Sequence, residues 1–138
     1  MDQIEQIKIN NQIVAIIIYN EFNKDGIQFF TPGDFSQQLG YMKHKKGYII
    51  QNHIHILHAR EIRYTQETLI IKRGHVRVDF FTDDKCYLTS RELNTGDVIL
   101  LASGGHGFEF LEETEIIEIK QGPYCGDQDK IHFNGDKH

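Results

Sequence analysis

Short runs of β-branched and aromatic residues, each ended by turn residues, constrain this chain most strongly. Clear examples are QIVAIIIY (12–19), ETLIIKRG (67–74), HVRVDFFT (75–82) and TEIIEIKQGPY (114–124). Val, Ile, Thr, Tyr and Phe favour strands, whereas Gly, Asn, Asp and Pro favour the turns between them. No long segment repeats its apolar residues with the 3.6-residue period of a helix. About nine or ten short strands at this spacing predict an all-β sandwich or barrel.

Three further segments complete the predicted order of elements. Asn10-Asn11 is predicted as a two-residue hairpin turn. The segment DFSQQLGYMKH (34–44) is predicted as a short helix or an irregular connection, and KKGYIIQNHIH (45–55) as a strand after a basic turn.

The length and composition fit a single small domain. The chain has 138 residues, close to the commonest domain size, so we expect one domain over 1–138. Its core is expected at about 10–125, followed by an extended polar tail at 126–138. The net charge of −5 argues against a nucleic-acid partner, which a basic face would favour. The apolar run 13–18 is too short to span a bilayer, so we expect no membrane partner.

Cys86 and Cys125 stand alone, without a CxxC motif. This usage favours two free, reduced thiols and a cytoplasmic location. A disulfide between them is the alternative.

Three histidines lie within six residues, at positions 53, 55 and 58. Side chains at i and i+2 of a strand point to the same face, so His53 and His55 would share a face with Gln51. Two imidazoles on one patch of sheet can bind a single metal ion. The alternative is that they are surface histidines on a polar loop.

Glu67 begins an alternating strand in which Leu69 and Ile71 share its face. A carboxylate at the end of an apolar inward face must be paired or bound to a cation, because burying it alone is costly. Glu67 is therefore a candidate metal ligand. The alternative is that it lies at an exposed mouth of the fold, or pairs with Arg60 or Arg63.

His106 follows a glycine-rich corner, where glycine permits the φ > 0 backbone of a tight turn. After the corner, His106, Phe108 and Phe110 alternate with Gly107 and Glu109, so His106 begins an inward face. It is a candidate ligand beside the other three. The alternative is a core histidine whose ring is satisfied by hydrogen bonds.

The spacing of these residues resembles the first motif of the cupin family. Gly47 is followed by five residues and then by His53 and His55, and Glu67 is followed by six residues and then by Gly74. Cupins show the same order of Gly, His-x-His, Glu and Gly. The resemblance implies a small β-barrel of the jelly-roll, or double-stranded β-helix, type.

A second motif and a longer signature carry the same resemblance. Gly96 begins GDVILLASGGHGFEF, in which His106 matches the histidine of the second cupin motif. This stretch, with EIKQGPY (118–124) and GIQFFTPGDFSQQLGYM (26–42), is similar to a group of small bacterial cupins. Small cupins often form homodimers, and the group implies a role in surface-polysaccharide or sugar-nucleotide metabolism.

The segment that resembles the first motif is longer here than in the cupin family. Eleven residues (56–66) separate His55 from Glu67, where the family has about three or four. His58 or Glu61 is the alternative to Glu67 as a ligand. An alternative is that the extra residues extend a hairpin over the mouth of the barrel, and the sequence leaves open whether they act as a lid.

The resemblance implies a metal site formed by His53, His55, Glu67 and His106. Three imidazoles and one carboxylate suit a divalent transition metal (Fe, Mn, Ni, Cu or Zn) better than Mg²⁺ or Ca²⁺, which prefer oxygen ligands. A cavity for a small polar ligand is expected beside it. The predicted cavity residues are Gln38, Tyr41, Gln51, Phe108 and Lys120.

Glu118 and Tyr124 are the candidate catalytic proton carriers. Glu118 and Lys120 share one face of a predicted strand, and they lie beside the metal if that face is inward. The alternation favours the other arrangement, an exposed pair with Ile117 and Ile119 in the core.

The residues and the resemblance together imply a metal-dependent enzyme, and the resemblance implies a small polar, sugar-like metabolite as its substrate. The expected reaction is isomerisation, epimerisation or elimination or, with Fe(II), dioxygenation. The alternatives are a non-catalytic ligand-binding cupin and a cupin that has kept the fold and lost the chemistry. Outward-facing Ile70, Val76 and Val78 favour a homodimer, unless the N-terminal hairpin covers that face.

Overall fold

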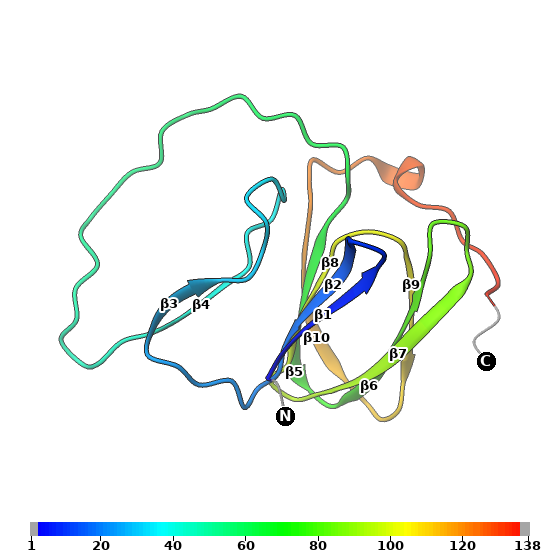
Figure 1. Cartoon of the computed structure of the whole chain (residues 1–138), viewed down its shortest axis with the longest axis horizontal. Coiled ribbons are helices and arrows are strands. Elements are labelled where there is room, and N and C mark those ends of the chain that lie inside the picture. The colour runs from blue at the N-terminus through cyan, green and yellow to red at the C-terminus, as the bar shows by residue number, and fades with distance from the viewer. Residues whose placement is uncertain (1–2, 136–138) are drawn as a thin grey trace.

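The computed structural model describes residues 3–135 of the chain (Figure 1). This part contains ten strands and one short 3-10 helix. The strands are β1 (Ile4–Ile9), β2 (Gln12–Ile18), β3 (Gly26–Phe29), β4 (Gly40–Lys43), β5 (Glu67–Arg73), β6 (His75–Phe81), β7 (Tyr87–Asn94), β8 (Val98–Leu101), β9 (Gly105–Phe110) and β10 (Glu115–Lys120), and the helix is η1 (Gly126–Asp129). The expected all-β class is confirmed. No helix within residues 3–135 is long and apolar enough to cross a membrane.

The strands form two larger sheets and a separate hairpin. The five-stranded sheet has the order β1-β2-β8-β5-β10, the three-stranded sheet has the order β7-β6-β9, and β3 pairs with β4. All of these pairings are antiparallel. The larger sheets lie face to face, but they do not close into a barrel within the chain (Figure 1).

An apolar layer between the two larger sheets holds them together. Leu69 and Ile71 of β5 and Val76 and Val78 of β6 all belong to one buried cluster, and none is more than 4% exposed. They alternate along their strands, so each strand turns one face to the interior. The expectation that Val76 and Val78 face outward is therefore wrong, because β6 turns this row toward the five-stranded sheet.

A turn from the segment between β2 and β5 packs on the outer face of the five-stranded sheet. Thr68 donates a hydrogen bond to the Gln37 side chain at 2.8 Å, and the Gln66 side-chain oxygen accepts from Ser36 Oγ at 3.1 Å. Ile70 borders a small cavity on the same side, together with residues of the β3–β4 region. This region, rather than the N-terminal hairpin, lies over the face that carries Ile70.

The predictions for the next two segments are partly wrong. Residues 34–39 form the expected irregular connection, but Gly40–Lys43 is a strand because it pairs with β3. Residues 44–66 contain no strand, although 45–55 has a strand pattern, because no strand of the chain lies alongside to accept its hydrogen bonds. We call residues 44–65 the arm. It leaves β4, curves far from the sheets and returns at β5, and every residue in it is exposed (Figure 1).

The C-terminal segment is anchored rather than simply extended. Lys120 pairs with Asp129 of η1 at 2.9 Å, and the Phe133 ring packs edge-on against Phe81 with centroids 5.1 Å apart. Residues 136–138 of the predicted tail lie outside the described residues. Cys86 and Cys125 are both free and exposed.

Asp97 is a buried carboxylate on which the turn before β8 depends. It is 4% exposed and accepts hydrogen bonds from the backbone N–H groups of Asn20, at 2.8 Å, and Asn94, at 2.7 Å. Asp97→Ala leaves both donors unsatisfied, so we expect it to lower the free energy of unfolding by about 2–4 kcal/mol. Urea denaturation measures this. Asp83→Ala, at an exposed position, is the control and should change stability by less than about 0.5 kcal/mol.

Candidate functional site

Four ionisable side chains gather where β5, β9 and β10 come together: Glu67, His106, Glu118 and Lys120. Glu67 starts β5 and shares the inner face of that strand with Leu69, as the sequence predicts. His106 lies opposite the buried Phe80 in the register of β9 against β6, which places it on the inner face of the other sheet. The cluster is therefore a polar extension of the apolar layer between the sheets.

Glu67 and His106 contact each other across the two sheets. Glu67 Oε1 lies 3.4 Å from His106 Nε2, and the two side chains are 16% and 26% exposed. Hydrogen bonding to His106 lowers the pKa of Glu67 to about 2, although burial acts in the opposite direction. Glu67 is therefore ionised at neutral pH. It pairs with neither Arg60 nor Arg63.

Glu118 faces the interior, contrary to the arrangement that the alternation favours. β10 pairs with β5 so that Glu118 lies opposite Leu69 and Lys120 lies opposite Glu67. Ile116, rather than Ile117, packs against the core cluster. The sequence could not settle this, because apolar residues occupy both faces of β10 and only the pairing with β5 distinguishes them.

Glu118 and Glu67 are hydrogen bonded to each other and have opposite pKa shifts. The hydrogen bond to Glu67 raises the pKa of Glu118 above its ordinary value, with burial acting in the same direction. One acid and one base side by side, with separated pKa values, are the arrangement that general acid–base catalysis requires.

Lys120 lies at the edge of this cluster. Its ammonium group contacts Asp129 at 2.9 Å, and Asp129 also accepts a hydrogen bond from Thr65 Oγ1 at 2.7 Å. Hydrogen bonding to Asp129 raises the pKa of Lys120. This cation therefore stays charged, and it ties η1 to the site.

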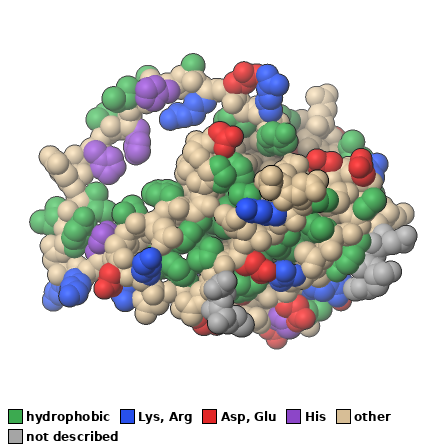
Figure 2. Space-filling model, viewed as in Figure 1, with side chains coloured by type: hydrophobic (Ala, Val, Ile, Leu, Met, Phe, Trp, Pro, Cys, Tyr) green, Lys and Arg blue, Asp and Glu red, His purple; other side chains and the backbone are tan. Residues whose placement is uncertain are grey.

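The other two predicted ligands lie on the arm. The rings of His53 and His55 have centroids 5.3 Å apart, and both side chains are exposed. Figure 2 shows histidine side chains spread along the arm, away from the body of the molecule. Within residues 3–135 no group of three or more His, Cys, Asp or Glu side chains is arranged to hold a metal ion. One chain therefore holds the predicted ligands as two separate pairs, one on the arm and one between the sheets.

The alternative ligands lie on the arm as well. His58 is exposed, and Glu61 pairs with Arg63 at 3.0 Å. Neither is brought to His106.

The predicted cavity and catalytic residues are dispersed. Gln38 binds the carbonyl oxygens of Pro32 and Phe35, and the Tyr41 ring packs against Phe22, outside the cluster. Gln51 is on the arm and Tyr124 is 87% exposed. Phe108 alone joins Lys120 beside the cluster, with its ring 5.7 Å from that of His106.

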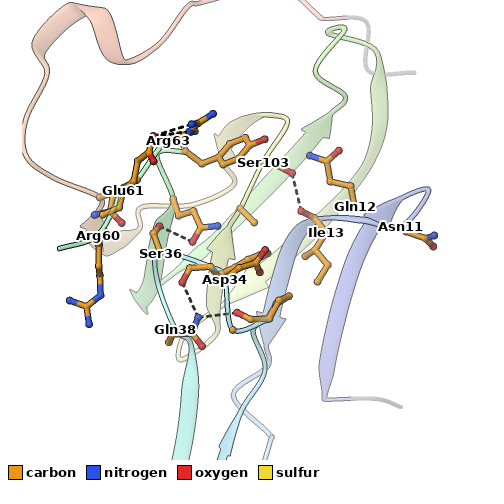
Figure 3. Close-up of a pocket in the computed structure, with 18 residues that line it drawn as sticks. Asn11, Gln12, Ile13, Asp34, Ser36, Gln38, Arg60, Glu61, Arg63 and Ser103 are labelled. Atoms are coloured by element: carbon orange, nitrogen blue, oxygen red, sulfur yellow. Dashed lines mark hydrogen bonds and ion pairs between the residues drawn. The ribbon is translucent and has the colours of Figure 1, made fainter. Parts of the chain in front are cut away.

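A separate cleft of about 1340 Å³ lies between the base of the arm, the turn at 32–38 and the β1–β2 turn (Figure 3). Several of its polar groups are already paired, among them Ser36 with the buried Gln66, and Ser103 Oγ with the carbonyl oxygen of Ile13. Neither Glu67 nor His106 lines it. Of the predicted cavity residues, Gln38 lines this cleft. The sequence did not indicate where the cleft lies, because hydrogen bonds between distant turns leave no periodic pattern.

Comparison of the chain with protein-family models, with curated proteins and with solved structures gives no match. The ionisable cluster, rather than the cleft, is the candidate functional site. Neighbouring ionisable groups with opposing pKa shifts, here the part-buried Glu67 and the exposed Glu118, are characteristic of functional sites.

The contact between Glu67 and His106 makes the pKa of Glu67 depend on the histidine. In His106→Ala we expect the pKa of Glu67 to rise from about 2 toward its ordinary value of 4.5, as measured by carboxyl carbon chemical shifts. The depressed pKa stabilises the fold above pH 4.5, and this stabilisation is lost as the pH falls through about 2. The stability difference between wild type and variant should therefore shrink over that interval. His75→Ala, which removes a histidine paired with Glu92 instead, should leave the Glu67 titration unchanged.

Proposed function

We propose that this chain is a metal-binding protein of the cupin type, and that it is an enzyme acting on a small polar, sugar-like metabolite. The observation that carries the proposal is the contact between Glu67 and His106, with Glu118 beside it. The contact joins one ligand from each predicted cupin motif, although they lie 39 positions apart in the sequence and in different sheets.

The side chains fit a transition-metal site in their chemistry. Glu67 is already ionised at neutral pH, as a metal ligand must be. His106 offers an imidazole beside it, and His53 and His55 are a second pair of imidazoles at the spacing of the first motif. This donor set suits Fe, Mn, Ni, Cu or Zn. Such an ion would supply a Lewis acid that polarises a carbonyl or hydroxyl oxygen of a substrate.

Glu118 favours an enzyme over a ligand-binding module. Its raised pKa, next to the ionised Glu67, makes it a candidate to give a proton to a bound molecule or to take one from it. An isomerase, epimerase or lyase uses proton transfer of this kind.

The test is the metal content of the protein, purified without chelator and reloaded with Fe, Mn, Ni or Zn in turn. We expect about one ion per chain in the wild type, and less than about 0.1 in Glu67→Gln and in His106→Ala, because each removes a ligand. Elemental analysis by mass spectrometry measures this. Glu118→Gln and His75→Ala are matched controls outside the ligand set, and both should retain the metal.

The metal content should also fall with pH, because histidine binds metal only in its neutral form. We expect loss as the pH drops below about 6.5, the ordinary pKa of imidazole. A wild-type protein that takes up none of these metals at pH 8 would contradict the proposal.

A further inference from the structure

The two larger sheets are open along one side. β9 ends the three-stranded sheet and β10 ends the five-stranded sheet, and no strand within residues 3–135 pairs with their outer edges. Phe108 and Phe110 lie opposite the buried Val78 and Val76, on the inner face, yet they are 39% and 55% exposed. An inner face that is exposed, next to two unpaired edges, is a sheet surface that lacks its cover.

The arm carries exposed apolar side chains that lack a partner surface. Ile54, Ile56 and Leu57 are 89%, 76% and 96% exposed. Among the described residues, 49–64 make no hydrogen bond to the rest of the chain. An extended segment this apolar is costly to keep in water. Apart from the carbonyl oxygen of Gln51, which lies 2.9 Å from His53 Nδ1, its backbone groups are available for a strand partner.

The sequence of the arm alternates as a strand does. Gln51, His53 and His55 fall on one face, and Ile54 and Ile56 fall on the other. If the arm extended a sheet beside β9, its histidine face would continue the row that His106 begins. The eleven residues 48–58 span about 36 Å when extended, more than the roughly 20 Å of a six-residue strand such as β9.

We infer that two copies of this chain exchange arms. The arm of each copy fills the open side of the other, and His53 and His55 of one copy join Glu67 and His106 of the second. The metal in this exchange rests on the proposed function. The geometric basis of the exchange, an uncovered sheet and an unpaired extended segment, is independent of any ion. The partner is a second copy of this chain, because one chain carries both the open side of the sheets and the arm that would cover it. The result is a two-fold symmetric dimer in which each copy gives and receives one arm.

The exchange requires each metal site to use residues from both copies, and paired variants test this. His53→Ala/His55→Ala removes the ligands of the arm, and Glu67→Gln/His106→Ala removes those of the sheets. Each variant alone should bind no metal. The two are produced together with different affinity tags, and the mixed dimer is isolated.

The mixed dimer distinguishes exchange from a site within one chain. With exchange, one of its two sites combines both defects and the other has none, so it should hold one ion per dimer, half the wild-type content. If both halves of a site came from one chain, each site would carry a defect and the mixed dimer would hold no metal. That result, with a metal-loaded wild type, overturns the exchange and leaves the proposed function standing.

The oligomeric state tests the exchange without any metal. Light scattering should give a mass near twice 16.1 kDa for the wild type. Ile56→Asp/Leu57→Asp places a charge on both faces of the arm and should yield the monomer. Ile131→Asp, at a position outside the arm that is 80% exposed, is the matched control and should remain dimeric. A monomeric wild type, or a double variant that stays dimeric, overturns the exchange even if the protein binds no metal.

Discussion

The packing of β5 against β6 and β9 determines where every ionisable group of the site points. Leu69 and Ile71 must face Val76 and Val78, because this contact buries the apolar layer between the sheets. Since side chains alternate along a strand, Glu67 is carried onto the same inner face, and His106 follows from its pairing opposite Phe80. A shift of one residue in either register would turn Glu67 or His106 outward and expose the apolar row to water. The site is therefore fixed by the same contact that stabilises the fold.

The sequence predicts those parts of the structure that depend on one strand at a time. The inward direction of Glu67 and His106 follows from the alternation along each strand, although β5 also carries one apolar residue, Ile70, on its outer face. Glu118 was not predictable in this way, because β10 carries isoleucine on both faces and the choice is made by its pairing with β5. Residues 45–55 show the opposite limit. Their pattern is that of a strand, but a strand needs a neighbour, and a local pattern contains no information on whether the chain provides one.

The opposed pKa shifts of Glu67 and Glu118 depend on how much water reaches them. On an open edge, water screens the contact between Glu67 and His106 and limits its strength. A segment that covered this side would exclude water, strengthen the attraction between the carboxylate and any nearby cation, and increase the cost of ionising Glu118. The pKa values of Glu67 and Glu118 would then differ more in a closed site than in a single chain. Closure of the sheets and the chemistry of the cluster are thus coupled.

Arm exchange also accounts for the unusual length of the first motif. Three or four residues between His55 and Glu67 would keep both on adjacent strands of one body, whereas the eleven residues 56–66 let His55 lie far from the start of β5. A site divided in this way binds metal only when two copies are together, so by linkage the metal must stabilise the dimer and the dimer must raise the affinity for metal. The arm then serves two purposes, since it pairs with the other copy and positions two of the proposed ligands. The exposed apolar arm that destabilises an isolated chain is, in this arrangement, the element that completes the site.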